Sequence, residues 1–233
     1  MDPIFASLAA QGLNLHAVFS LESLPPEVLA TLALTDEECG RFRQLILIGH
    51  RGRDFWTALQ RRGMHGAHPM DQFVTERVAA WMAGPLQGHT WRQVFPGTQP
   101  VGLQRLGALA GWHHPSPFWV GVDAAWGSWF AYRAVVLADT RLALTPRRET
   151  PSPCKTCTGK PCIEACPAGA LASEQTGAWR LQTCLDFRKQ AASPCQDRCL
   201  ARNACPVGAD HRYTDSQIAY HYLHSMRAIR ERY

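Results

Sequence analysis

Cysteine is the residue type in this chain whose number and spacing most clearly point to chemistry. Eight of the nine cysteines lie between residues 154 and 205, and only Cys39 stands apart. The eight are Cys154, Cys157, Cys162, Cys166, Cys184, Cys195, Cys199 and Cys205. Thiolates are the preferred ligands of iron–sulfur clusters, with four for each [4Fe–4S] cube. Eight cysteines therefore indicate two cubes.

The spacing of the first four cysteines supports this interpretation. They form the run C-x2-C-x4-C-x3-C-P, close to the bacterial ferredoxin run C-x2-C-x2-C-x3-C-P. In such a run the close cysteines wrap a short loop around one cube, and the cysteine before the proline points to the other cube. The later spacings, C-x3-C and C-x5-C-P, are also wider than usual, so longer loops must close on each cube.

Three other uses of the cysteines remain open. Eight thiolates can bind two zinc ions, because C-x2-C is also a zinc spacing. They can form disulfides in an oxidising compartment, or they can simply be buried. The two C-P ends, which open P-A-G-A and P-V-G-A turns, are typical of ferredoxin loops and favour clusters.

Length and composition describe an ordinary globular protein. The 233 residues suit one large domain or two modest ones, with 46% apolar and 18% charged residues. The net charge of +5 suits an acidic electron-donor protein or an anionic cofactor and is not the dense basic stripe of a nucleic-acid binder. The N-terminus has no basic segment typical of a signal peptide, and no apolar run reaches the ~18 residues of a membrane span. Because cluster thiols need a reducing interior, we expect a cytoplasmic protein, and we expect no membrane or nucleic-acid partner.

Apolar periodicity predicts an α+β fold in which strands and helices are interleaved. Strands are expected at 13–21, 44–50, 90–96, 118–123 and 129–138. Helices are expected at 1–11, 25–34, 53–63, 71–83 (capped by Asp71), 101–110 and 215–230. These elements predict a layered domain over 1–145, a polar linker, and a cysteine module with a C-terminal helix over 150–233. Neither G-x-G-x-x-G nor G-x-x-x-x-G-K-[ST] is present to support a nucleotide site.

The cysteine module resembles a known family. Between its two C-P runs lies the lone Cys184, in T-C-L-D-F, as in the two-cluster ferredoxin-like modules of epoxyqueuosine reductases and reductive dehalogenases. The resemblance implies crossed ligation, in which one cube is held by Cys154, Cys157, Cys162 and Cys205. The other cube is then held by Cys166, Cys184, Cys195 and Cys199.

The first 145 residues carry two further resemblances. The runs L-G-A-L-A-G-W (106–112) and G-S-W-F-A-Y-R-A-V-V-L (127–137) resemble epoxyqueuosine reductases in order and spacing. The second run and H-P-M-D-Q-F-V (68–74) are similar to the cobalamin-processing family defective in cblC-type methylmalonic aciduria. Both resemblances imply a nitroreductase-like domain that binds cobalamin.

The resemblance also implies which residues contact cobalamin. Gly127 and Ser128 would let the backbone approach the corrin ring. The side chains of Trp129, Phe130 and Tyr132 would line the ring, and Arg133 would contact a polar group. The arginine would meet a propionamide, the nucleotide phosphate or a thiol co-substrate. An alternative is His68 as a lower cobalt ligand, although these families usually hold the base-off form without a protein histidine. Taken alone, W-F-A-Y-R-A-V-V-L also fits an ordinary central strand.

Together these features predict a cobalamin-binding reductase that relays electrons from a flavodoxin, ferredoxin or reductase through two cubes to cobalt. Reductive removal of the upper ligand of cobalamin is the preferred reaction. Reduction of a small substrate, of the epoxyqueuosine or halide type, is an alternative. The tRNA reductases carry an acidic proton donor shortly before their A-G-x-G-W stretch, and residues 95–106 contain no acid. The second alternative is an electron-transfer protein without cobalamin, whose first domain is a docking platform or binds flavin.

Overall fold

The computed structural model describes residues 2–171 and 180–233. The chain divides into two compact units, one formed by Met1–Gly111 and Phe130–Glu149, the other by Trp112–Trp129 and Thr150–Tyr233. The boundaries expected from the sequence, 1–145 and 150–233, differ from this division in the placement of residues 112–129.

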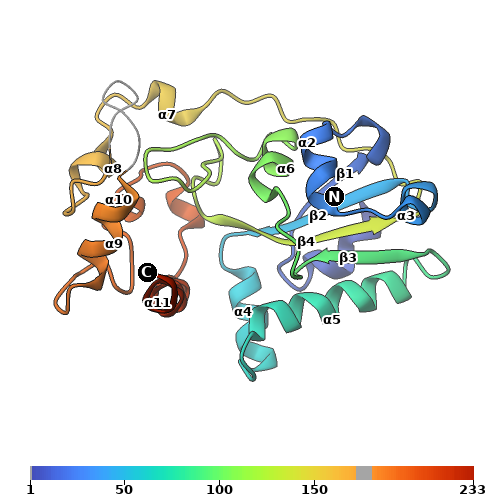
Figure 1. The fold of residues 1–233 in the computed structure, drawn as a ribbon, viewed down its shortest axis with the longest axis horizontal. Coiled ribbons are helices and arrows are strands. Elements are labelled where there is room, and N and C mark those ends of the chain that lie inside the picture. Colours follow the sequence, from blue (N-terminus) through green and yellow to red (C-terminus); the bar gives the residue numbers. More distant parts are fainter. Residues whose placement is uncertain (1, 172–179) are drawn as a thin grey trace. The chain divides into compact units, whose positions relative to one another are not determined.

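The first unit is built on a four-stranded antiparallel sheet with the strand order β1-β2-β4-β3 (Figure 1). Its strands are β1 (Leu15–Ser20), β2 (Gln44–Arg51), β3 (Trp91–Phe95) and β4 (Phe130–Ala138). All four coincide with expected strands, and helices are interleaved with them. The predicted α+β class is therefore confirmed.

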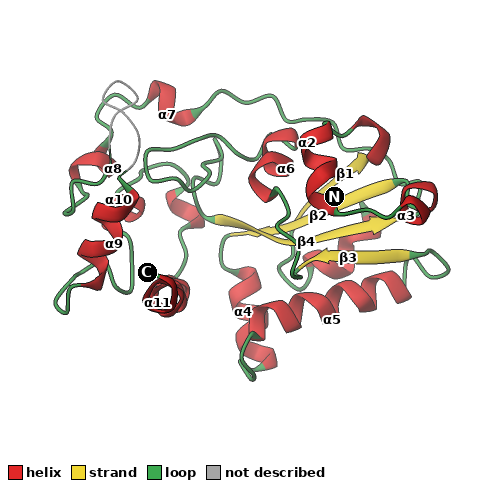
Figure 2. Ribbon diagram, viewed as in Figure 1, coloured by secondary structure: helices red, strands yellow, loops and turns green. Residues whose placement is uncertain are grey.

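The strand β2 lies in the interior of the sheet and is buried on both faces. Its residues 45–48 have no exposed side-chain surface, because helices cover the sheet on its two sides (Figure 2). Successive side chains of a strand point to opposite faces. Accordingly, on β4, Tyr132 packs against Gly107 of α6, whereas Arg133 packs against Phe55 of α4.

The helices of this unit are short, apart from α4 and α5. They are α1 (Ala6–Ala9), α2 (Pro26–Leu29), α3 (Asp36–Arg41), α4 (Asp54–Arg62), α5 (Pro69–Ala83) and α6 (Leu103–Leu109), with 3-10 turns η1 (Pro3–Phe5), η2 (Leu21–Ser23) and η3 (Ala30–Leu32). Contrary to the expected cap at Asp71, α5 begins at Pro69, because proline suits the first turn of a helix. Its Trp81 indole donates to the Ile4 carbonyl (2.7 Å) and stacks on Phe5, which anchors the N-terminal turn.

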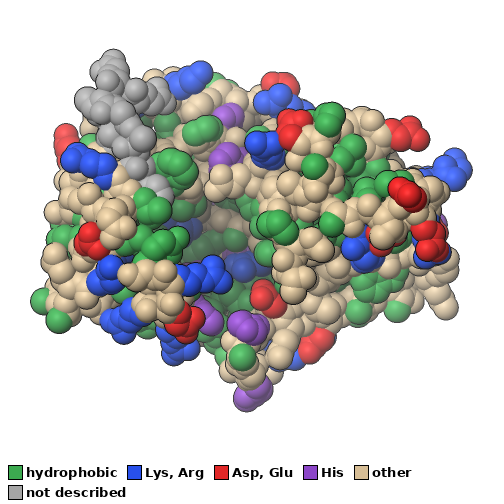
Figure 3. All heavy atoms as spheres, in the orientation of Figure 1, with side chains coloured by type: hydrophobic (Ala, Val, Ile, Leu, Met, Phe, Trp, Pro, Cys, Tyr) green, Lys and Arg blue, Asp and Glu red, His purple; other side chains and the backbone are tan. Residues whose placement is uncertain are grey.

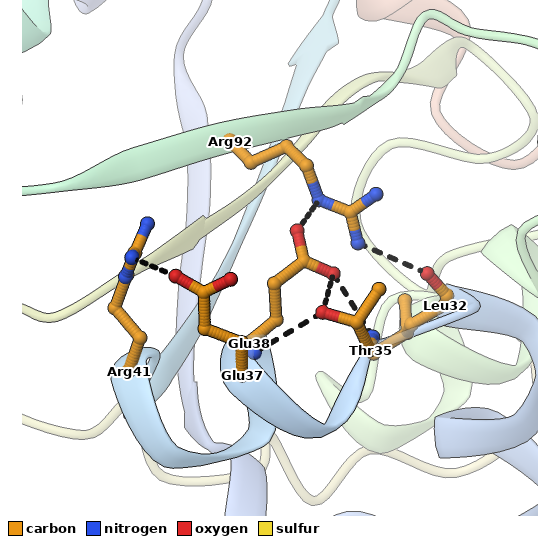
Figure 4. A network of polar contacts seen from close by, with 6 residues as sticks. All are labelled: Leu32, Thr35, Glu37, Glu38, Arg41 and Arg92. Carbon is orange, nitrogen blue, oxygen red and sulfur yellow. Dashed lines mark hydrogen bonds and ion pairs between the residues drawn. The ribbon is translucent and has the colours of Figure 1, made fainter.

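Sequence periodicity did not predict the helix α3, which is stabilised at its start by a capping box. The Thr35 hydroxyl accepts from the Glu38 backbone N–H, while the Glu38 carboxylate accepts from the Thr35 backbone N–H (Figure 4). The same carboxylate forms an ion pair with Arg92 of β3 at 2.8 Å. Arg92 also donates to the Leu32 carbonyl, so one arginine ties this helix to the edge strand.

In the second unit, the strand expected at 118–123 is absent, and that prediction is wrong. Residues 112–129 form a loop with two isolated bridges, His114 to Val122 and Asp123 to Gly127. Trp119 has a φ of +62°, which a β-strand does not accommodate. The buried Asp123 carboxylate accepts from the backbone N–H groups of residues 125 and 126, which turns the chain instead of extending it.

The rest of the second unit consists of short helices followed by one long helix. They are α7 (Pro153–Thr156), α8 (Pro161–Glu164), α9 (Leu181–Lys189), α10 (Leu200–Asn203), the 3-10 turn η4 (Ala209–His211) and α11 (Asp215–Arg232). The helix α11 matches the C-terminal helix expected from the sequence and buries Ile218, Met226 and Ile229 on one face. Across residues 2–171 and 180–233, no helix has both the length and the apolar character needed to cross a membrane.

Candidate functional site

The eight clustered cysteines line two separate cavities of the second unit. One cavity is lined by the first group, Cys154, Cys157, Cys162 and Cys205. The other is lined by the second group, Cys166, Cys184, Cys195 and Cys199. These are the two sets that the family resemblance implies, and they are interleaved in the sequence. Ligation of a cluster by either group stays a prediction.

Short helices and prolines position the first group. Pro153 and Pro161 each occupy the first turn of a helix, so that Cys154 lies on α7 and Cys162 on α8. Cys205 follows α10 and reaches the same cavity from the far end of the cysteine array. The side chains of Cys162 and Cys205 are buried in one apolar cluster. Tertiary packing therefore assembles this group across about fifty residues of sequence.

The second group lies among α9, α10 and α11. Cys184 is carried by α9, and Cys199 caps α10 by accepting a hydrogen bond on Sγ from the Arg202 backbone N–H (3.4 Å). Arg188, four residues after Cys184, donates through Nε to the Cys195 carbonyl (3.1 Å). Tyr222 of α11 completes the wall. Figure 3 shows Lys and Arg side chains gathered over α9 and α11, whose last turns are basic.

Burial and mutual repulsion raise the pKa values of thiols in both groups. Burial, together with repulsion from the three other members of its group, raises the pKa of the Cys154 thiol to about 11, and Lys160 partly opposes this shift. Burial likewise raises the pKa of Cys184, an effect that Arg188 opposes and that the three other members of the second group increase. Thiolates held this close together repel one another, and a bound positive centre would offset that repulsion.

The four cysteines of each group line one cavity that is partly open to solvent. Among the described residues, no three His, Cys, Asp or Glu side chains form a site for a single metal ion. The ligands of a cube bind different iron atoms and stand further apart than ligands of one zinc ion at ~2.3 Å. The donor atoms at both groups, four cysteine sulfurs each, fit a [4Fe–4S] cluster.

Phe118 is a site residue that the sequence did not reveal. Its ring is buried (8% exposed) and lines both cavities, so it forms a wall common to the two cysteine groups. It packs in one cluster with Val122, Leu171 and Ala201. Its segment was predicted to be a strand of the other domain, and nothing in the sequence but its apolar character marks Phe118. The loop 112–129 is therefore part of the cysteine module.

Three of the predicted cobalamin contacts belong to the second unit and make internal contacts there. A Cβ on Gly127 (φ +59°) would lie 1.9 Å from the Val207 carbonyl oxygen, so glycine is needed for a close backbone crossing. Ser128 is buried and holds Arg202, which donates to its hydroxyl (3.1 Å) and its carbonyl (2.6 Å). Trp129 is fully buried, with the Arg202 guanidinium 4.7 Å above its ring. A role of these residues against cobalamin stays a prediction.

The other three predicted contacts, Phe130, Tyr132 and Arg133, lie on β4 of the first unit. The rings of Phe130 and Tyr132 meet edge to face, with centroids 5.7 Å apart. Arg133 donates through Nε to Nδ1 of the buried His50 (3.0 Å), and its guanidinium stacks over Phe55. The strand thus presents a positioned cation on one face and aromatic rings at its start. The alternative ligand, His68, is exposed at the start of α5.

Comparison with solved structures identifies the fold. An epoxyqueuosine reductase from Bacillus subtilis matches with a TM-score of 0.55 and 12% identity, over 91% of this chain and 66% of that chain. A second epoxyqueuosine reductase, determined with an epoxyqueuosine-modified tRNA stem loop, has a TM-score of 0.55 and 10% identity, over 93% and 67%. The B12-trafficking protein CblC from C. elegans has a TM-score of 0.52 and 13% identity, over 94% and 88%.

The fold is that of epoxyqueuosine reductases and CblC. At these identities the similarity concerns the fold alone, and this chain spans about two thirds of the length of the epoxyqueuosine reductases. No protein-family model and no curated protein sequence matches it. The structural resemblance expected from the sequence is confirmed.

Proposed function

We propose that this protein is an iron–sulfur oxidoreductase that binds cobalamin and passes electrons through two [4Fe–4S] clusters to cobalt. Its preferred reaction is reductive removal of the upper ligand of cobalamin. One observation carries the proposal: eight cysteines are divided between two four-cysteine cavities in a chain with this fold. Neither a ferredoxin-like cysteine pattern nor the fold alone would point so directly to cobalamin reduction.

The second unit acts in this proposal as a ferredoxin-like electron-transfer module. Clusters held by the two groups supply one-electron transfer at low potential. The protein's own contribution is to hold eight thiolates in two sets and to exclude water with apolar side chains such as Phe118. Its basic α9 and α11 ends suit an acidic electron donor such as a flavodoxin.

The first unit supplies the cobalamin site in this proposal, as a nitroreductase-like domain. Arg133 is held in place by His50 and Phe55, so its charge is preorganised for a phosphate or amide of the ligand. Phe130 and Tyr132 offer apolar ring surface of the kind that packs against a corrin. The fold similarity to a B12-trafficking protein supports cobalamin as the ligand.

The second candidate is reduction of a small group with cobalamin as the cofactor. Similarity to an epoxyqueuosine reductase determined with a tRNA stem loop favours an epoxide of this kind. Residues 95–106, which contain no acid, weigh against it. A binding test with an epoxyqueuosine-modified tRNA stem loop therefore tests the expectation that this protein has no nucleic-acid partner. Electron transfer without cobalamin is the third candidate.

Anaerobic reconstitution followed by addition of cob(II)alamin tests the proposal. We expect about eight iron and about eight acid-labile sulfide per chain, since each cube contains four of each. Cys39→Ser is the matched control and keeps this content, because Cys39 is exposed and outside both groups. Cob(II)alamin should then bind with a spectral shift, and cyanocobalamin should lose its cyanide under dithionite.

The outcomes separate the candidates. Zinc without sulfide would reject the clusters. An iron content near eight per chain without any cobalamin binding would leave electron transfer without cobalamin as the function. Cobalamin that binds and stays catalytic while a tRNA epoxide is reduced would make it the cofactor and not the substrate.

A further inference from the structure

The two cysteine cavities differ in the charged side chains around them. The first cavity is lined mainly by prolines, Phe118 and Val207, and the one charged residue in its wall is Lys160. Arg212, outside this wall, also acts electrostatically on Cys205. Two arginines, Arg188 and Arg198, line the second cavity. The cavities differ in the type of cation as well as in the number of cations. The lysine ammonium is more strongly hydrated than a guanidinium and sits on a flexible stem.

Arg188 is fixed against the second cavity by all three of its guanidinium nitrogens. Nε donates to the Cys195 carbonyl (3.1 Å), Nη1 to the Ser225 hydroxyl (3.2 Å) and Nη2 to the Tyr222 carbonyl (3.3 Å). The guanidinium also lies over the Tyr222 ring, 5.3 Å from its centroid. These contacts connect α9 to α11 and to the backbone of a predicted ligand, so the position of the charge is well defined.

The charge of Arg188 is not neutralised by these contacts. Its three acceptors are two carbonyls and a hydroxyl, none of which carries a negative charge. Arg198, in contrast, makes two hydrogen bonds to the Asp197 carboxylate, at 2.9 and 3.0 Å, which cancels most of its field. Of the two arginines at the cavity, Arg188 is therefore the one whose positive charge acts on the sulfurs.

A fixed positive charge favours the reduced form of a nearby cluster. Reduction adds one electron from the donor, with no bond made or broken, so a cluster with four thiolates becomes more negative by one charge. A cation stabilises that added charge by Coulomb attraction, whereas apolar surroundings oppose it. We propose that Arg188 makes a cluster held by the second group easier to reduce than one held by the first, so that the first electron accepted is held there. This inference rests on the proposed function, since it requires clusters at both groups.

The measurement is a redox titration with dithionite, followed by electron paramagnetic resonance on the reconstituted full-length protein. Cys162→Ala and Cys184→Ala, which each leave one intact group, assign the two midpoints. We expect the midpoint of the second group to be the higher. Arg188→Gln should lower it by about 59 mV, which corresponds to a tenfold change in a one-electron equilibrium, and leave that of the first group unchanged.

Lys189→Gln is the matched control, since it removes the same charge from the next residue of α9. Lys189 does not line the cavity and pairs with Asp186 at 3.2 Å. It should leave both midpoints in place. If Arg188→Gln loses the second cluster, Arg188→Lys keeps the charge and should keep the higher midpoint.

Equal or reversed midpoints in the unmodified protein overturn the inference, as does a midpoint that Arg188→Gln leaves unmoved. An iron content near four per chain in the unmodified protein would indicate a single cluster and would also overturn the inference. Iron near eight with the expected midpoints but no cobalamin binding would refute the proposed function and leave this inference standing.

Discussion

Replacement of Gly127 by alanine should disrupt the second unit where two backbone segments cross. A Cβ at this position would lie 1.9 Å from the Val207 carbonyl oxygen, and one on Gly208 would lie 2.1 Å from the carbonyl carbon of Trp126. The loop 112–129 and the turn after Cys205 therefore touch through two glycines. A methyl group there must push the two backbones apart, because neither side is a flexible side chain.

The magnitude follows from two separable costs. Gly127 has a φ of +59°, and an L-residue in the left-handed region costs about 1–2 kcal/mol. Gly169 has a φ of +58° but no atom within 4 Å of an added Cβ, so Gly169→Ala carries only this first cost. The steric overlap at Gly127 adds about 1–3 kcal/mol, as for overpacking of a filled interior. We expect about 2–5 kcal/mol for Gly127→Ala and about 1–2 kcal/mol for Gly169→Ala.

The assay is thermal unfolding of the reconstituted protein without cobalamin, with iron content measured in parallel. At about 2–4 °C per kcal/mol for a chain of this size, Gly127→Ala should lower Tm by about 10 °C and Gly169→Ala by about 3 °C. Iron should be lost preferentially from the first group, because Cys205 lies at the displaced turn. Equal effects of the two substitutions would refute the close crossing, and an effect of Gly127→Ala seen only with cobalamin present would assign the glycine to the ligand site instead.

Three further predictions concern individual contacts. Glu38→Gln should destabilise by about 1–2 kcal/mol in urea unfolding, because it weakens a capping box and an ion pair, whereas the exposed Glu37→Gln should cost under about 0.5 kcal/mol. Arg202→Lys should cost about 2–4 kcal/mol in the same assay, because a lysine cannot reproduce both bonds to Ser128. Burial lowers the pKa of His16 to about 4, so the unfolded chain binds the extra proton first on acidification. Stability should therefore fall by up to about 3 kcal/mol between pH 6.5 and pH 4.

Each of these predictions has a contrary result. Equal losses for Glu38→Gln and Glu37→Gln would mean that the network of Figure 4 contributes nothing beyond a surface charge. An Arg202→Lys variant as stable as the unmodified protein would show that charge alone matters at this position. If His16→Asn has the same dependence of stability on pH as the unmodified protein, the titrating group lies elsewhere.

The chain's local chemistry could be predicted from the sequence alone. Hydrophobic periodicity identified all four strands of the sheet, because strands such as β2 are apolar runs whose length and flanking residues leave few alternatives. The number of cysteines and the two C-P ends indicated two four-cysteine sites. The helix α3 was missed, because its stability comes from a capping box and an ion pair to β3 and not from an apolar stripe.

Only the tertiary structure decided what surrounds the cysteines. It moved residues 112–129 into the second unit, where Phe118 separates two cavities and Gly127 allows a close crossing. It also placed Arg188 and Tyr222, 34 residues apart in sequence, at the same cavity. The reason is physical: ligand spacing is a local property of the chain, whereas the walls and charges around a site come from packing between segments that are distant in sequence.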